Sequence, residues 1–270
     1  MKTFKIWNND KKQEVLEYLY KKDPIQYLFL ISDIEQYGLQ NQNIKTFVLY
    51  NKKIEAIFLM FYSNLVVLFD TDAININEFL KILNDEDIQN LIIDTNFYNF
   101  LNKHKLIDSL GYIVEKEQIA KLDVNIFNIL TKDFLPKSKP VTETDIIEVI
   151  NSKKLIKEWG NVSGHTLNVE YLTNELKSGY YQAYIIKDEQ KVISHASISA
   201  KNKQVAMIGG VYTLNQYRRQ GLAYDCVVNL IRKLLSQNLT PVLFFSNPAA
   251  AKMYYKLGFK DYGQLFVLHK

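Results

Sequence analysis

The feature that most constrains this chain is a strand, a tight turn and a helix that follow one another in the middle of its second half. The apolar run Val205 to Val211 predicts the strand, and the polar residues up to Gly221 predict the turn. After the turn, apolar side chains recur at the 3.6-residue period of an amphipathic helix. The predicted apolar face comprises Ala223, Val227, Leu230, Ile231 and Leu234, and the predicted polar face comprises Asp225, Asn229, Arg232 and Lys233.

The turn has the chemistry of an anion site. Backbone N–H groups in the first turn of a helix have no partner inside the helix, and the helix dipole adds partial positive charge there, so a phosphate fits. Gly221 allows close approach of a ligand, and Arg218 and Arg219 can pair with phosphate oxygens. The chain has 33 Lys plus Arg but only three arginines, and two of them are adjacent here. This placement indicates that phosphate geometry matters in the turn.

Two further sequence motifs identify the kind of turn. The chain has no G-x-x-x-x-G-K-[ST] and no G-x-G-x-x-G, which argues against a P-loop and a dinucleotide fold. R-x-x-G-x-A at 218–223 resembles the pyrophosphate-binding loop of the GNAT superfamily of acetyl-CoA-dependent N-acetyltransferases. NPAAAKMYYKLGF at 247–259 is similar to the N-x-x-A-x-x-x-Y-x-x-x-G-F signature of that superfamily. The loop taken alone could also be an ordinary strand-to-helix turn with two surface arginines.

The resemblance implies an α/β fold, with a central mixed, mostly antiparallel sheet flanked by helices, and acetyl-CoA (coenzyme A) as the cofactor. It implies that the strand at 204–213 separates from its neighbour and binds the pantetheine arm through its backbone. Gly209 and Gly210 fit this, since glycines in a strand often mark a bulge or a close backbone approach. The implied cofactor-binding residues are Val211, Tyr212, Thr213, Arg218, Arg219, Gln220, Gly221, Leu222, Ala223 and Asn247.

Acetyl transfer needs a neutral amine, a positioned thioester and a proton for the departing thiolate. The resemblance places Tyr254 where many members protonate the sulfur, and a phenol with a reference pKa of about 10 stays protonated at neutral pH. A core tyrosine is the alternative. His195, on the preceding strand, could act in catalysis directly or through water, and a structural histidine is the alternative. Many members carry a glutamate on the strand at 204–213, which here has no acid.

The helical region before these strands is where the superfamily usually binds the acceptor. It offers further candidate residues, each of which could instead be a surface or packing residue. They are Trp159, His165, Glu170 and Tyr171.

The order of predicted elements occurs twice, which suggests an internal duplication. In the first half we expect a single helix from about Asn96 to Leu110, which parallels the helix after Asn247 with four extra residues, about one helical turn. We expect a degenerate GNAT-like domain without a cofactor loop at 1–131, a linker at 132–140 and a catalytic GNAT domain at 141–270. Where the second half has its arginine and glycine loop, the first half has Asp70 and Asp72, which would repel a pyrophosphate. The first half has a net charge of 15 − 19 = −4 over 1–135 and the second 18 − 10 = +8 over 136–270. An unrelated α/β domain is the alternative for the first half.

Composition excludes several classes of function. The start of the chain lacks an apolar signal core, and the longest apolar run, 56–69, is shorter than the roughly 20 residues of a membrane helix. We therefore expect a cytoplasmic protein without a membrane partner. A single cysteine, Cys226, rules out an intramolecular disulfide and a cysteine-cluster metal site, and the four histidines are too scattered to propose a metal site. No Lys/Arg-rich run or aromatic ladder indicates a nucleic-acid partner.

The predicted function is acetyl-CoA-dependent N-acetylation of a primary amine, either a small molecule or a peptide, and a homodimer is one option for assembly. A non-catalytic acyl-CoA-binding or sensor protein is the second hypothesis, since the strand glutamate is absent. A partner-binding protein that acts through its first domain is the third.

Overall fold

The computed structural model describes residues 3–71, 74–156 and 167–270, and the chain forms two compact units. Unit 1 comprises Met1–Ile119 and Asp261–Lys270, and unit 2 comprises Ala120–Lys260. The mixed α/β class predicted from the sequence is confirmed. The units divide the chain differently from the expected domains, because residues 120–131 belong to unit 2 and the last ten residues belong to unit 1.

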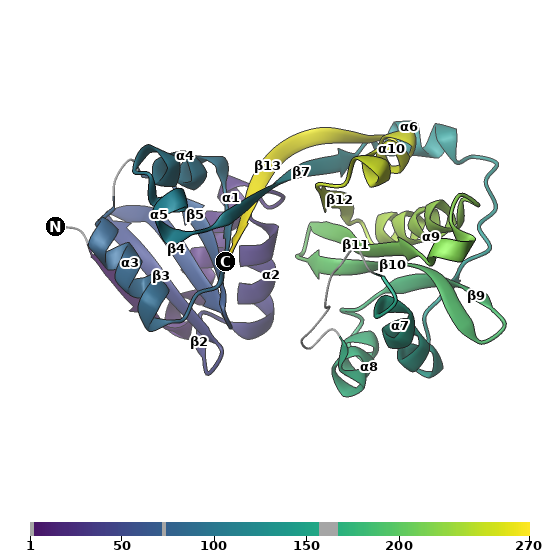
Figure 1. Ribbon diagram of the computed structural model, residues 1–270, viewed down its shortest axis with the longest axis horizontal. Helices are drawn as coiled ribbons and strands as arrows, with labels where there is room; N and C mark the ends of the chain where they lie inside the picture. Colours follow the sequence, from purple (N-terminus) through teal and green to yellow (C-terminus); the bar gives the residue numbers. More distant parts are fainter. Residues whose placement is uncertain (1–2, 72–73, 157–166) are drawn as a thin grey trace. The chain divides into compact units, whose positions relative to one another are not determined.

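Unit 1 is a mostly antiparallel sheet with helices on both faces (Figure 1). Its strands follow the order β1-β3-β4-β5-β6-β13, in which only β5 and β6 pair in parallel. In chain order, the elements up to β7 are β1 (Phe4–Trp7), a 3-10 helix (Asn9–Lys11), α1 (Lys12–Lys22), α2 (Leu28–Tyr37), β2 (Gln40–Asn41), β3 (Ile44–Asn51), β4 (Lys53–Phe61), β5 (Asn64–Phe69), α3 (Ile76–Asp85), β6 (Asn90–Ile93), α4 (Thr95–Lys103), α5 (Leu106–Leu110) and β7 (Ile113–Leu122).

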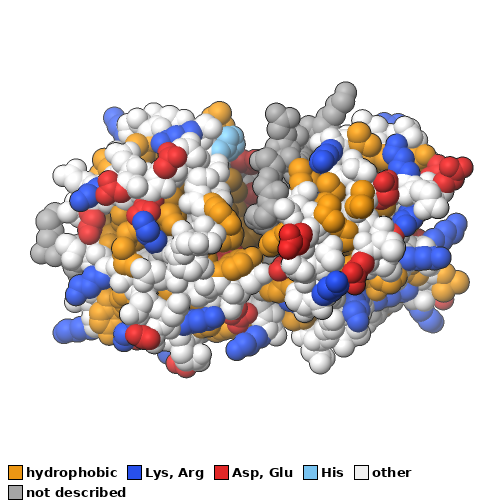
Figure 2. Space-filling model, turned by 90° about the horizontal axis from the view of Figure 1, so that it is seen from below, with side chains coloured by type: hydrophobic (Ala, Val, Ile, Leu, Met, Phe, Trp, Pro, Cys, Tyr) orange, Lys and Arg blue, Asp and Glu red, His pale blue; other side chains and the backbone are white. Residues whose placement is uncertain are grey.

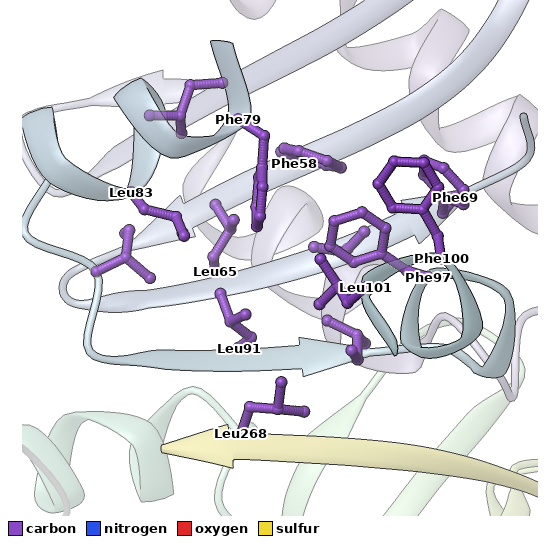
Figure 3. Close-up of a cluster of buried hydrophobic side chains, with 14 of the residues drawn as sticks. Phe58, Leu65, Phe69, Phe79, Leu83, Leu91, Phe97, Phe100, Leu101 and Leu268 are labelled. Atoms are coloured by element: carbon purple, nitrogen blue, oxygen red, sulfur yellow. The ribbon is translucent and has the colours of Figure 1, made fainter. Parts of the chain in front are cut away.

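Alternating side chains of the unit 1 strands build two separate cores. On β4, Phe58 and its period-2 neighbours face α3, α4 and α5, whereas Ile57 and Leu59 face α1 and α2. The first core is rich in aromatic rings, among which Phe58 and Phe79 both contact Phe97 (Figure 3). The strands are apolar on both faces because helices cover both faces.

Unit 2 repeats this architecture. Its sheet follows the order β12-β11-β10-β9-β8, and only β11 and β12 pair in parallel. One face packs against α6, α9 and α10, and the other against α7 and α8. The elements are α6 (Val124–Leu130), β8 (Lys139–Pro140), a 3-10 helix (Glu143–Asp145), α7 (Ile146–Lys153), α8 (Val169–Lys177), β9 (Ala183–Asp188), β10 (Lys191–Lys201), β11 (Val205–Thr213), a 3-10 helix (Asn215–Tyr217), α9 (Leu222–Ser236), β12 (Thr240–Phe245) and α10 (Pro248–Lys256). The last strand, β13 (Phe259–His269), begins in unit 2 and pairs with β6 in unit 1.

One helix of the first half differs from its predicted form. The single helix expected from Asn96 to Leu110 is two helices, α4 and α5, separated by Lys105 in the left-handed region at φ +54°. The additional residues of this segment therefore do not lengthen one helix, because the chain breaks at Lys105 and starts a second helix. The N-cap of α4 is Asp94, because its carboxylate accepts the N–H of Phe97.

Part of the polar face of α9 is covered by another segment of the chain. Asp225, expected there, is only 6% exposed, and it accepts two backbone N–H groups from the segment that was expected to be a linker. Asn229 and Arg232 donate to carbonyl groups of the same segment. The hydrogen bonds are Lys137 N to Asp225 (2.7 Å), Ser138 N to Asp225 (2.8 Å), Asn229 to Ser138 O (2.9 Å), and Arg232 to Thr131 O (2.8 Å) and Phe134 O (3.0 Å). Residues 131–138 are thereby fixed along α9.

We expect Asp225→Ala to lower the free energy of unfolding of unit 2 by about 1–3 kcal/mol, because two N–H groups lose their acceptor. Lys233→Ala, an exposed change on the same helix, should stay within about 0.5 kcal/mol of the wild type. Urea unfolding followed by circular dichroism measures both. Equal midpoints for the two variants would show that the Asp225 contacts do not stabilise the fold.

Candidate active site

The site begins where two parallel strands stop pairing. β11 and β12 pair from Val205–Thr240 to Ile208–Leu243, although β11 continues to Thr213 and β12 to Phe245. In the part of the chain that the structure describes, their ladder ends at that point. The β12-facing backbone of β11 after Ile208 is therefore left to bind another partner, which is the separation that the sequence predicted.

β11 contains a β-bulge directly after the point where its pairing with β12 ends. The register with β10 runs from Ile198–Ile208 and Ser197–Gly209 to His195–Tyr212, so that β11 has one residue more than β10 between these pairs. Gly210 lies in the left-handed region at φ +57°. A Cβ there would lie 2.9 Å from Ser197 Oγ, so that a side chain would be strained by the backbone conformation and would also require Ser197 to shift. At Gly209 a Cβ would lie 2.0 Å from Ser199 Oγ, so the serines of β10 account for both glycines.

His195 holds the bulge in place. Its Nδ1 lies 2.6 Å from the Gly210 carbonyl oxygen, which can only accept, so Nδ1 carries the proton and donates it. Nε2 then accepts from the Tyr181 hydroxyl at 2.8 Å. The ring is fully buried and stacks against Tyr212, with centroids 5.1 Å apart. Burial, followed by the nearby charge of Lys153, lowers the pKa of His195 to about 3, while the hydrogen bond to Gly210 opposes the shift.

These contacts favour a structural role for His195 over the catalytic role that the sequence also allowed. Both ring nitrogens are occupied, and the neutral form is the stable one at physiological pH.

The predicted pantetheine-binding residues use their side chains inside the fold. The Tyr212 hydroxyl forms a hydrogen bond with Ser152 Oγ of α7, and Thr213 Oγ1 lies 2.9 Å from Ser194 Oγ. Val211 packs against the core beneath α9. Only backbone groups of these residues could face a cofactor, which is the kind of contact that the resemblance implies.

The predicted phosphate loop turns tightly into α9. Arg218 Nε donates to the Thr213 carbonyl oxygen at 3.0 Å, which ties the loop to the end of β11. Arg219 and Gly221 both have positive φ, at +65° and +78°. Gly221 is the N-cap of α9 and provides no side-chain acceptor, so the cap leaves the first-turn N–H groups of Leu222 and Ala223 without a side-chain bond. The only acid of that turn, Asp225, is bound to residues 137 and 138.

The second motif lies on α10. Asn247 caps this helix, with its Oδ1 accepting from Ala249 N at 2.8 Å, so its amide nitrogen remains the group suited to a ligand. Tyr254 is 6% exposed, and its ring contacts Phe245 and Phe259. Burial raises the pKa of Tyr254 to about 12, which keeps the phenol protonated at neutral pH.

The predicted acceptor region is described only in part. Trp159 and His165 lie outside the described residues. Glu170 is exposed on the first turn of α8, and Tyr171 packs against the core beneath α7. Sequence reasoning missed Lys153, the last residue of α7, which is 8% exposed. Nothing in the pattern could have revealed it, because a lysine at the end of an amphipathic helix is expected to be solvated.

Unit 1 contains the same strand opening but fills it. β5 and β6 pair in parallel from Asn64–Asn90 to Val66–Ile92, and β5 continues to Phe69. Asp94 follows β6 as Asn247 follows β12. One carboxylate oxygen of Asp94 caps α4, and the other accepts from Phe69 N (3.3 Å) and the Tyr27 hydroxyl (3.1 Å). Burial raises the pKa of the Asp94 carboxyl, and a small hollow beside it is lined mostly by apolar side chains, together with Gln26 and Tyr27.

Asp70, which we expected to repel a pyrophosphate, is bound by neighbouring side chains of unit 1. Asp70 forms an ion pair with Lys22 and accepts a hydrogen bond from the Tyr18 hydroxyl, so its charge is engaged within unit 1. Asp72 lies outside the described residues. The filling of the strand opening by Asp94 is the stronger support for a first unit without cofactor.

Comparison with known proteins agrees with this geometry. Residues 175–266 match the family model for GNAT acetyltransferases. Over these residues the chain is similar to GNAT acetyltransferases. This match covers β9 to β13 for most of their length, and so includes the strand opening, the phosphate loop and Tyr254. The comparison with curated proteins gave no match.

Solved structures show the fold of the whole chain. A GCN5-related N-acetyltransferase-like protein from Streptococcus suis is 17% identical, with 97% of this chain and 99% of that chain covered and a TM-score of 0.61. A tandem GNAT protein from the clavulanic acid biosynthesis pathway is 11% identical, covering 99% and 97%, with a TM-score of 0.63. A GCN5-related N-acetyltransferase from Sphaerobacter thermophilus is 11% identical, covering 99% and 95%, with a TM-score of 0.64. The predicted tandem GNAT fold is thereby confirmed.

The pKa of His195 predicts a specific loss of stability in acid. The folded-state pKa, about 3, lies below the ordinary value of about 6.5. Between these two pH values His195 is protonated in the unfolded chain and neutral in the folded chain. The stabilisation is complete above pH 6.5 and declines as the pH falls toward 3. We expect His195→Gln to lack this component, so that its unfolding free energy falls less steeply than that of the wild type between pH 6.5 and 4. Parallel pH profiles from urea unfolding would contradict the assignment.

Proposed function

We propose that this protein is an acetyl-CoA-dependent N-acetyltransferase that acts on a primary amine, either a small molecule or a peptide. GNAT family and fold support acyl transfer in general. The observation that carries the finer proposal is the order of features after Ile208: an unpaired strand edge, a bulge at Gly210, and a helix start at Gly221 without a side-chain cap. These three features provide backbone donors and acceptors for a pantetheine arm, followed by an anion site for a pyrophosphate.

The residues of the GNAT domain divide the work as follows. The first-turn N–H groups of α9, with the guanidinium groups of Arg218 and Arg219, hold the pyrophosphate. Bound acetyl-CoA supplies a thioester that a neutral amine can attack. Backbone N–H groups around Val211 stabilise the negative charge that develops on the carbonyl oxygen, and the His195 hydrogen bond to Gly210 fixes their direction.

Tyr254 is the proposed proton donor to the departing thiolate. Its pKa of about 12 keeps it protonated until the sulfur, with a reference pKa of about 8.5, needs the proton. Thiolate release would bring a negative charge close to the phenol, and proton transfer would move that charge to Tyr254. The tyrosinate would then regain a proton, through solvent, as the acylated amine nitrogen loses one.

A non-catalytic acyl-CoA-binding or sensor protein is the second candidate. Two observations favour it: β11 has no acidic residue, and the His195 ring is buried with a lowered pKa. Neither β11 nor His195 therefore provides a general base to deprotonate the amine. Turnover with intact cofactor binding separates the two candidates.

Charge and surface favour a small or peptide acceptor over a nucleic acid. Lys, Arg, Asp and Glu side chains are interspersed on the face shown in Figure 2, rather than gathered by sign. No helix among residues 3–71, 74–156 and 167–270 has the length and apolarity needed to cross a bilayer. We propose a cytoplasmic setting without a membrane partner, and a homodimer as one assembly to test by sedimentation.

Acetyl-CoA should raise the melting temperature of the wild type, because a ligand at 100 times its dissociation constant adds about 2.7 kcal/mol. The Arg218→Ala/Arg219→Ala double variant should show a much smaller shift, because it lacks two phosphate partners. Lys191→Ala/Lys203→Ala removes the same charge from exposed positions of unit 2 and serves as the control. A wild type that does not shift at saturating acetyl-CoA would refute cofactor binding.

Tyr254→Phe should lower kcat by about 10²- to 10⁴-fold, because the thiolate loses its proton donor. The shift in melting temperature with acetyl-CoA should remain, since the ring still packs against Phe245. Tyr255→Phe, an exposed tyrosine one residue along α10, is the matched control. Steady-state release of coenzyme A across a panel of amines provides the rates, and an unchanged kcat for Tyr254→Phe would exclude it as the acid.

A further inference from the structure

Lys153 is a buried cation that the mechanism above does not use. It ends α7 and is 8% exposed, with its ammonium 5.6 Å from the centre of the Tyr181 ring. Among the described residues, no carboxylate lies within ion-pair distance of its ammonium and no hydrogen bond satisfies it. Burial lowers the pKa of Lys153 to about 8, so the site disfavours the charge that the side chain carries.

A chain of contacts links Lys153 to the bulge of β11. Its ammonium lies over the ring of Tyr181, the Tyr181 hydroxyl donates to His195, and His195 donates to the Gly210 carbonyl. The preceding residue, Ser152, bonds to Tyr212 on the other side of the same bulge. The C-terminal end of α7 therefore lies over the backbone that would hold the reacting thioester, on the face of the sheet opposite α9.

An unpaired ammonium in this position is costly to the free protein, and a ligand that brings a negative charge removes the cost. Lys153 is a single point charge, and no second cation accompanies it in the contacts of Tyr181 and His195. A singly charged carboxylate matches it, whereas a phosphate dianion would leave an excess negative charge in a buried site and takes several donors.

We propose that Lys153 binds a carboxylate of the acceptor, so that the acceptor is an amine that also bears a carboxylate, as an amino acid does. The inference rests on the proposed acetyl transfer and names the acceptor's class. The carboxylate contacts Lys153 at the end of α7, and the amine of the same molecule reaches the thioester beside Gly210 and Val211.

The test compares amines that differ only in the carboxylate. The pairs are lysine with cadaverine, phenylalanine with phenethylamine, and serine with ethanolamine. Each compound is titrated against the protein saturated with coenzyme A, and the melting temperature measures binding without requiring turnover. The variants are Lys153→Met, which removes the charge, Lys153→Arg, which keeps it, and Lys154→Met, an exposed neighbour that serves as the control.

We expect the carboxylate-bearing member of at least one pair to bind the wild type, and to bind Lys153→Met about tenfold to a hundredfold more weakly, as the loss of a charged hydrogen bond predicts. Its partner without the carboxylate should bind both proteins equally, and Lys154→Met should match the wild type. Lys153→Arg should retain part of the preference. Without ligand, Lys153→Met should melt no lower than the wild type, because an unpaired buried charge has been removed.

Three results would overturn the inference: no carboxylate-bearing amine binds the wild type, Lys153→Met weakens both members of a pair equally, or Lys153→Met alone melts well below the wild type. The last would show that the fold itself already satisfies the ammonium. Acetyl transfer is then assayed with the same pairs. Transfer to both members at equal rates refutes this inference and leaves the proposed function standing, whereas Lys153-dependent binding without transfer refutes the proposed function alone.

Discussion

The hydrogen bond from His195 to the Gly210 carbonyl is the interaction on which the site depends. It joins β10 to β11 at the bulge beside Gly210, where regular pairing is broken, and a second bond from Tyr181 fixes the ring that makes it. A β-bulge leaves backbone groups out of the ladder and re-aims the chain. Because the imidazole is buried and neutral, this bond is insulated from solvent at physiological pH.

The two halves show how one architecture can gain or lose a binding site through the residue after a strand. Both open a pair of parallel strands, β5 with β6 and β11 with β12. In unit 1 the following residue, Asp94, directs its carboxylate to the N–H of Phe69 and so uses the backbone that the opening exposes. In unit 2 Asn247 caps only its own helix. The difference of one carboxylate therefore separates a filled opening from an available one, and the first half is free to serve as a scaffold.

Sequence reasoning reached the strand-turn-helix at 205–236, the duplication and the GNAT fold, because each depends on local periodicity and short motifs. It placed Asp225 on the polar face of the helix but could not show that this residue is buried, since a helical pattern shows which residues are polar but not what covers them. It also read a single helix at 96–110, where Lys105 in the left-handed region breaks the chain. The assignment of the last ten residues to unit 1 was not foreseeable, because the sequence pattern of an apolar strand does not show which other strand it pairs with.

The sequence by itself determined the elements, their order and the chemistry of the loop, because helix periodicity, glycine placement and the pair Arg218–Arg219 act over a few neighbouring residues. Only the tertiary structure decided the states of His195 and Lys153. Their burial comes from residues far along the chain: Gly210 and Tyr181 enclose the imidazole, and α7 carries the lysine to the same sheet face. Desolvation depends on everything packed around a group, so a pattern of single residues cannot express it.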